Sequence, residues 1–363
     1  MRQLAALTRR LPAAGPRALA VAVYSGARGE LFDARESGVE GVACVDDAAR
    51  ACVLLCRLWA VTGNVALRSW AEGLLDFVLW MHEADGRWHN FVYDWNGARN
   101  REGPTSVAGI NFWQARAIFA LAEATLLLDN GAARGVLADG LAAASAGSPP
   151  PDVRALHALT ALAVLHRAPD PWLSSRLAVW CEELAGCRAD GMLMNSPDER
   201  GRPHLWGHVQ EAALIDAAVA LDRQDLREVA VSSANAVFTD VIESGFDLPH
   251  VHAYDVQSAV FVMDRLAAGT GQQKYRELAQ KARSWFDGRN PAHEVIYDRS
   301  IGRVADGLDD GRLNDRSGAE ANISAGLALS DDPLVLSMAG GWTGRRVRRG
   351  ITQAAPIARP NTR

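Results

Sequence analysis

The sequence predicts an all-α protein that folds as one closed ring of helical hairpins. Apolar residues recur at helical spacing from residue 42 onward, in stretches of about 15–20 residues, several of which end at Thr-Gly, Asp-Gly or Asn-Gly. The alanine-rich composition favours helices, and alternating Val, Ile and Tyr strands are scarce. Long connections recur at alternate junctions. A ring of hairpins requires this pattern if one rim is tight and the other carries the insertions.

Eleven helical stretches follow one another, and residues 3–25 can supply a twelfth. The stretches are 45–63, 64–86, 109–131, 133–147, 151–168, 170–186, 207–222, 224–245, 253–271, 272–288 and 319–330. The longest joints are 83–108, 188–206 and 288–318, and they hold the two strand-like segments RWHNFVYDW and HEVIYD. No linker rich in Pro, Gly or Ser divides the chain. We therefore expect one domain (38–332), between an N-terminal segment (1–37) and a basic, flexible tail (333–363).

Composition and charge exclude several classes of protein. With 48% hydrophobic and 22% charged residues, the chain has ordinary globular composition, and no apolar run reaches the ~18 residues of a membrane span. The five cysteines form no CxxC pair, so neither a disulfide framework nor a structural zinc site is expected. Both ends of the chain carry Arg and no acidic residue, so the part between them is acidic. An acidic domain is not suited to binding nucleic acid. The short apolar run near the N-terminus does not make a secretory signal, so the prediction is a cytoplasmic protein.

The first group of chemically capable residues opens the helix at 45–63. Asp46 and Asp47 lie at its positive end, and Arg50 follows one turn later. The small, apolar approach Gly-Val-Ala-Cys-Val predicts that the carboxylates are partly buried, and buried carboxylates need a purpose or a partner. The alternative is helix capping by one aspartate, with Arg50 as its ion-pair partner.

A second group lies between the next helices. Trp88 and Asn90 belong to the loop motif DGRWHNF, whose aromatic and amide groups suit a polyol; the alternative is a polar loop packed by its own aromatics. Trp113 and Arg116 begin the following helix. Arg116 lies on an otherwise apolar helix and must find a carboxylate such as Asp46, either in a binding site or as a structural ion pair.

Polar residues also crowd the starts of later helices. His208 and Gln257 belong to two of them. His250, His252 and Asp255 resemble metal ligands, but an HxH pair shares one side only in a strand and no matching cluster accompanies it, so no metal and no cofactor are expected. The segment 285–320 adds Asp306, Asn314 and Glu320. For Glu320 the alternative is a capping box with Ser317.

Four motifs together resemble the six-hairpin glycosidase-like proteins of bacteria, which occur alone or fused to glycosyltransferases. The motifs are EGVACVDDAARA, DGRWHNF, the W-x-x-R helix and the tail WF-x-G-x-N…YD…DGL…N-x-x-SGAE, and they span about residues 38–330. The resemblance implies an (α/α)6 toroid whose inner helices point their N-terminal ends at a shared pocket, with carbohydrate as the ligand. Fused relatives tend to carry acids just before the helix arginine. Here that stretch, Ser106–Asn111, carries none.

These observations predict a carbohydrate-active protein, with an inverting glycoside hydrolase of bacterial oligo- or polysaccharides as the favoured activity. Closure of the ring would bring together the catalytic carboxylates Asp46, Asp47 and Glu320. The residues expected to bind substrate are Arg50, Trp88, Asn90, Trp113, Arg116, His208, Gln257, Asp306 and Asn314. One alternative is a lyase or epimerase that acts on a uronate through Tyr, His and Arg. Another is a sugar-binding or assembly module that serves a glycosyltransferase, without catalysis.

Overall fold

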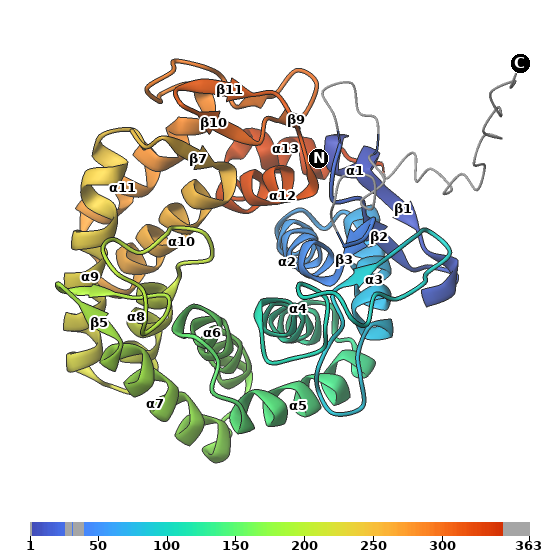
Figure 1. The fold of residues 1–363 in the computed structure, drawn as a ribbon, viewed down its shortest axis with the longest axis horizontal. Helices are drawn as coiled ribbons and strands as arrows, with labels where there is room; N and C mark the ends of the chain where they lie inside the picture. The colour runs from blue at the N-terminus through green and yellow to red at the C-terminus, as the bar shows by residue number, and fades with distance from the viewer. Residues whose placement is uncertain (1, 26–30, 32–39, 344–363) are drawn as a thin grey trace, which may run out of the picture.

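The computed structural model describes residues 2–25, 31 and 40–343, and its helices form the predicted ring. Six helices line the inside: α2 (Val45–Thr62), α4 (Phe112–Leu128), α6 (Pro151–Arg167), α8 (Gln210–Ala220), α10 (Ala253–Thr270) and α12 (Ala319–Ala328). Their outer partners are α3 (Val65–Trp80), α5 (Gly131–Ala146), α7 (Pro171–Gly186), α9 (Gln224–Glu243), α11 (Gln273–Arg283) and α13 (Pro333–Gly340). Each inner helix packs against the next, and α12 packs against α2 (Figure 1). The prediction of an all-α (α/α)6 toroid is therefore confirmed.

Small residues close this ring. A Cβ atom on Gly326 of α12 would lie 2.5 Å from a methyl carbon of Leu54 on α2, so only glycine permits the two helices to approach this closely. The inner helices are otherwise rich in fully buried alanines, which bring neighbouring helices close together. Asn64, Asn111, Asn130 and Asp170 cap the starts of four helices by accepting a backbone N–H.

The twelfth helix is α13, and the prediction that residues 3–25 supply it is wrong. This part of the chain forms a short helix α1 (Arg2–Leu7), a hairpin of β1 (Thr8–Arg10) and β2 (Leu19–Val21), and the 3-10 turn η1 (Pro12–Ala14). Pro12 and Pro16 prevent one continuous helix over residues 3–25, because proline is not tolerated inside a helix. Leu7 and Leu11 are buried against the ring, so this part of the predicted N-terminal segment belongs to the domain.

The beginning of the predicted tail is also part of the ring. The Asn64 side chain donates hydrogen bonds to the carbonyl groups of Ala339, Gly340 and Trp342 at the end of α13. The Trp342 ring packs edge-on against Trp70, with 4.6 Å between the ring centres. The domain therefore extends beyond residue 332, and residues 344–363 of the predicted tail lie outside the described residues.

Short antiparallel strands connect the loops that precede the inner helices. Among them, β3 (Ala43–Cys44) pairs with β4 (Phe91–Val92), and β10 (Gly307–Asp309) pairs with both β7 (His250–His252) and β11 (Arg312–Asn314). Two further pairs are β5 (Arg188–Ala189) with β6 (Met192–Leu193), and β8 (Tyr297–Asp298) with β9 (Arg303–Val304). Because β3 and β7 lead directly into α2 and α10, these pairings fix where both helices begin. Within the described residues, no helix is both long and apolar enough to cross a membrane.

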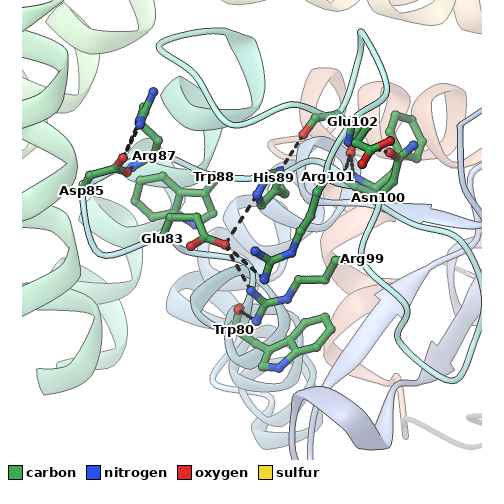
Figure 2. A network of polar contacts seen from close by, with 12 residues as sticks. Trp80, Glu83, Asp85, Arg87, Trp88, His89, Arg99, Asn100, Arg101 and Glu102 are labelled. Carbon is green, nitrogen blue, oxygen red and sulfur yellow. Dashed lines mark hydrogen bonds and ion pairs between the residues drawn. The ribbon is translucent and has the colours of Figure 1, made fainter.

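A polar network holds the loop that carries the DGRWHNF motif (Figure 2). The Glu83 carboxylate forms ion pairs with Arg99 at 3.5 Å and Arg101 at 3.7 Å, and lies 3.5 Å from the His89 ring. Arg99 also stacks over the Trp80 ring, 4.1 Å from its centre. The loop is thus held by its own charges and aromatic rings, as in the alternative interpretation of this motif.

Candidate active site

A cluster of two arginines and three carboxylates lies where the first two turns of α2 and α4 meet the first turn of α12 inside the ring. Arg50 is the centre of this carboxylate–arginine cluster. Its guanidinium group lies 2.9 Å from Asp46, 2.7 Å from Asp47 and 3.0 Å from Glu320. Arg116 of α4 forms a hydrogen-bonded ion pair with Asp46. The structure therefore brings Asp46, Asp47, Glu320, Arg50 and Arg116 together, as expected from ring closure.

The start of α2 is held by residues that come before it and by the neighbouring loop. The helix is capped by Cys44, whose sulfur accepts the Asp47 backbone N–H at 3.4 Å and whose thiol donates to the Asp47 carboxylate at 3.3 Å. The Asn90 side chain accepts the Asp46 backbone N–H at 3.1 Å and is 5% exposed. Asn90 therefore positions the helix start, and little of its surface remains for a ligand.

Burial and charge separate the two aspartates. Burial raises the pKa of Asp47 to about 7; Glu320 and Asp46 add to this effect, and Arg50 opposes it. Burial acts on Asp46 in the same direction, but Arg116 and Arg50 more than offset it and lower the pKa of that carboxyl group. Asp46 therefore favours its ionised form, and Asp47 holds a proton more readily than Asp46 does.

Glu320 is the most exposed carboxylate of the cluster. Its side chain is 35% exposed, against 14% for Asp46 and 4% for Asp47. Besides Arg50, it accepts a hydrogen bond from the Trp206 indole N–H at 3.0 Å. The capping box that was the alternative role for Glu320 is not formed: α12 has no side-chain cap, and the Ser317 hydroxyl accepts from Asn322 instead. The Glu320 carboxylate is therefore available to a ligand.

The first turn of α10 adds a fourth carboxyl group that the sequence analysis did not assign to the site. The Asp255 carboxylate accepts the His252 backbone N–H at 2.9 Å, and 15% of the side chain is exposed. Burial raises the pKa of Asp255 to about 7, although the His252 hydrogen bond lowers it, and the negative charge of Glu320 adds to the rise. The His252 ring stacks on Tyr254, with 4.9 Å between the ring centres.

Asp306 and Tyr24 lie close enough to the cluster for its negative charges to raise their pKa values. The Asp306 carboxylate accepts the Gly318 backbone N–H at 2.8 Å just before α12. Burial raises the pKa of Asp306, and Glu320 adds to the rise. Burial raises the pKa of Tyr24 to about 12, with a further contribution from Asp47. Asp306 therefore lies beside the cluster, as expected, and supports the start of α12.

Aromatic side chains form a wall beside the cluster. The Trp206 ring lies 4.5 Å from Phe112 and 6.5 Å from Tyr254, centre to centre. Arg116 stacks over both Phe112 and Trp206, at 5.1 and 5.0 Å. The sequence analysis assigned none of these three rings to the site. For Trp206 and Phe112 the available signal was their place at a helix start, next to His208 and Asn111.

The two tryptophans predicted to contact substrate lie elsewhere. Trp88 is fully buried, and its indole N–H donates to the Val78 carbonyl. It therefore has no face for a sugar, and this prediction is wrong. The indole N–H of Trp113 donates to the Trp88 carbonyl, on the side of α4 that meets the 81–111 loop. Trp113 does not line the central cavity described below.

His208 and Asn314 have structural partners instead of a place in the site. His208 is fully buried; its ring nitrogens lie 2.7 Å from the Asn195 side chain and 3.0 Å from Glu211. The Asn314 amide donates to Asp309 across the β10–β11 hairpin. The predicted contact of His208 with substrate is therefore wrong, and Asn314 stabilises a rim hairpin.

A cavity of about 560 Å³ continues from the cluster along the inner helices. Arg50, Arg116, Tyr254 and Gln257 line its upper end. Gln257 thus occupies the position expected from the sequence. Among the described residues, no group of three or more His, Cys, Asp or Glu side chains is arranged to hold a metal ion.

The fold defines a class of protein, the (α/α)6 toroids, and known structures share it. No family model matches the sequence, and no curated protein matches it. A sugar epimerase from a ruminal bacterium superposes with a TM-score of 0.67 at 12% identity, covering 86% of this chain and 92% of that one. A D-mannose isomerase gives 0.61 at 9% identity, covering 93% and 95%. The endoglucanase CelQ from Clostridium thermocellum, complexed with cellotriose, gives 0.54 at 13% identity, covering 87% and 64%. At these identities the likeness shows the six-hairpin fold.

Proposed function

We propose that this protein is a glycoside hydrolase that acts at the carboxylate–arginine cluster. One observation carries the proposal: the partly exposed carboxylate of Glu320 lies near buried carboxyl groups whose pKa values are raised to about 7. Hydrolysis of a glycosidic bond requires one protonated carboxyl group and one ionised carboxylate on either side of the bond. The raised pKa values suit the buried groups to the protonated role, and Glu320 is proposed for the other role.

Glu320 is assigned the role of the ionised partner. The Arg50 guanidinium and the Trp206 indole N–H each lie 3.0 Å from the same oxygen, and these two contacts orient the carboxylate. A water molecule activated by this carboxylate would attack the anomeric carbon.

Asp255 is assigned the role of the proton donor. Asp47 also has a raised pKa, but both of its oxygens are engaged, by Arg50 and by Cys44, and 4% of its side chain is exposed. Arg50 also limits how far Asp47 lies from Glu320. The two oxygens it contacts cannot be more than about 5.7 Å apart, the sum of both contacts. An inverting enzyme needs carboxyl groups ~6.5–9.5 Å apart, so Asp47 lies too close to Glu320 for inversion, and we assign the proton to Asp255 instead.

This assignment changes the role expected for Asp46 and Asp47. Asp46 binds both arginines, and Asp47 binds Arg50. We assign them as positioning residues that hold Arg50 and Arg116 towards the substrate. Arg116, Gln257 and the Trp206 ring are then the groups that contact sugar hydroxyls and a sugar face.

A sugar epimerase is the second candidate, and His252 is the observation that favours it. Its ring lies 3.9 Å from the Asp255 carboxylate and stacks on Tyr254 at the first turn of α10. An imidazole paired with a carboxylate suits removal of a proton from carbon. Two proteins with this fold, described as a sugar epimerase and a D-mannose isomerase, act on sugars.

NMR in D2O distinguishes these activities. Purified protein is incubated with cellobiose, cellotriose, mannose and a panel of bacterial oligosaccharides, and the anomeric proton signals are followed. Hydrolysis with inversion produces a new reducing end that first appears as the opposite anomer. Epimerisation leaves the linkage intact and exchanges the C2 proton for deuterium. Saturable sugar binding without either change would contradict the proposal and support a binding module.

The variants Asp255→Asn and Glu320→Gln connect the reaction to the cluster. Each is expected to lower turnover by at least ~10²-fold, the contribution typical of a general acid or base. Asp247→Asn, at an exposed position, is the matched control. Full turnover in Glu320→Gln would refute the assigned roles.

A further inference from the structure

The central cavity extends far below the carboxylate–arginine cluster. On α2 its lining runs from Arg50 to Val61, which corresponds to about 16 Å of helix at 1.5 Å per residue. It reaches the last turns of α4 and α10 at Leu127 and Ala268. Val61 is 67% exposed, so the lining ends in an apolar residue at the opposite rim. We call the part of the cavity below Arg50 and Arg116 the apolar chamber.

Aliphatic and phenyl side chains dominate the wall of this chamber. They come from α2, α4, α6, α10 and α12. The apolar lining residues are Val53, Ala60, Val61, Phe119, Leu127, Leu156, Leu159, Val260, Phe261, Ala268, Leu327 and Ala328. No tryptophan in the described part of the chain lines it, so it lacks the broad flat ring that suits a sugar face.

Most charged side chains along the chamber are paired with protein groups, and the exposed Asp331 lies just beyond the end of α12. Arg57 of α2 forms an ion pair with Glu123 of α4 and lies over the Phe119 ring. Arg265 pairs with Asp216 at 3.4 Å and lies over the Phe261 ring, 5.2 Å from its centre. These pairs satisfy the charges within the wall. The surface left for a ligand is therefore mainly hydrocarbon.

A second sugar unit does not suit such a chamber. Each sugar ring carries several hydroxyl groups, and a hydroxyl buried without a partner costs about 1–3 kcal/mol. An alkyl or aryl group has no such cost and gains from leaving water. The whole cavity, upper end included, has a volume of about 560 Å³, within the range of small-molecule sites, ~300–1,000 Å³.

We infer that the ligand is an amphiphilic glycoside, with its sugar at the carboxylate–arginine cluster and its apolar aglycone in the chamber. The placement of the sugar at the cluster rests on the proposed function. The placement of the aglycone in the chamber rests only on the residues that line the chamber. Arg50, Arg116 and Gln257 would mark the boundary, since they line the top of the same cavity.

Titration calorimetry with chains of increasing length tests the inference. The probes are n-alkyl β-D-glucosides of four to eight carbons below their micelle concentrations, with free glucose and the matching n-alkanols. The dissociation constants of the glucosides and the alkanols are expected to fall about three- to fourfold with each added methylene, until the chamber is filled.

Two variants locate the binding. Ala60→Trp places a large ring in the far part of the chamber from an exposed position on α2, and is expected to stop the gain in affinity at a shorter chain than in the parent protein while the glucose affinity stays unchanged. Ala142→Trp, at an exposed position on the outer helix α5, is the matched control and should behave like the parent protein. Gln257→Ala should weaken the glucosides but not the alkanols.

The outcomes separate the two halves of the inference. Affinity that does not depend on chain length overturns the inference, and so does a gain in affinity that extends to equally long chains in Ala60→Trp and in the parent protein. The alkanols can bind with the expected dependence while each glucoside binds no more tightly than the matching alkanol. That result supports an apolar ligand in the chamber and contradicts sugar binding at the cluster.

Discussion

Replacing Asp255 by Asn should change how the stability of this protein depends on pH. Burial raises the pKa of Asp255 from 3.8 to about 7 in the folded protein. A carboxyl group with a raised folded-state pKa stabilises the fold fully below its unfolded-state pKa. That contribution is lost as the pH rises through the folded-state value. Between about pH 4 and pH 7, the folded protein therefore loses stability at this residue, and Asn, which does not titrate, removes the loss.

The size of the effect follows from the shift. Three pKa units correspond to about 4 kcal/mol, at 1.36 kcal/mol per unit. About two of those units fall between pH 5 and pH 8, which gives a ceiling of about 3 kcal/mol for that interval. The Asp255 side chain is 15% exposed, so solvent screening reduces this value little. Asp255→Asn should therefore become more stable relative to the parent protein as the pH rises from 5 to 8.

Chemical denaturation at pH 5, 6, 7 and 8 measures this difference. The free energies of unfolding of the parent, Asp255→Asn and the exposed control Asp247→Asn are compared at each pH. The control should follow the parent throughout. Equal pH dependence in Asp255→Asn and the parent would show that Asp255 titrates normally, and would remove the proposed proton donor.

Three further substitutions test the fold and the roles of buried residues by denaturation. Trp342→Ala should lower the free energy of unfolding by about 1–3 kcal/mol because it removes the contact with Trp70. The control Trp172→Ala, at a 47% exposed position, should change that free energy little. Equal effects of the two substitutions would contradict the docking of α13. His208→Ala should cost about 2–4 kcal/mol because Asn195 and Glu211 lose a buried partner; a loss of sugar affinity at unchanged stability would instead restore His208 as a binding residue. Asp46→Asn should cost about 3 kcal/mol because Arg116 loses its ionised partner; an unchanged free energy would mean that the pair contributes nothing.

The ring could be predicted from the sequence because its signals are periodic and repeat along the chain. Helical spacing and alternating loop lengths do not depend on distant contacts, and they indicated five complete hairpins and the inner helix of the sixth. The last outer helix was missed. Its eight residues, Pro333–Gly340, are almost uniformly apolar and carry no amphipathic pattern, and the arginines further along gave the whole segment a basic composition.

The sequence predicts the site residues that lie at helix starts. It does not predict the residues whose role is decided by the direction in which the side chain points. Asp46, Arg50, Arg116 and Glu320 begin helices that a closed ring must bring together. The tryptophans show the limit, because Trp88 and Trp206 both lie in loops with polar neighbours. Trp88 packs inward on the outer helices, and Trp206 faces the cluster. Only tertiary packing decides between these two outcomes.

The measurement that tests the central claim most directly compares turnover and binding in Glu320→Gln. Turnover is measured on the best glycoside of the panel, and the dissociation constant of the same glycoside is measured by calorimetry. Glu294→Gln, outside the cluster, is the control. We predict that turnover falls by at least ~10²-fold while the dissociation constant changes by less than about tenfold, because the carboxylate acts on the reaction more than on the bound sugar. Unchanged turnover in Glu320→Gln would contradict the account.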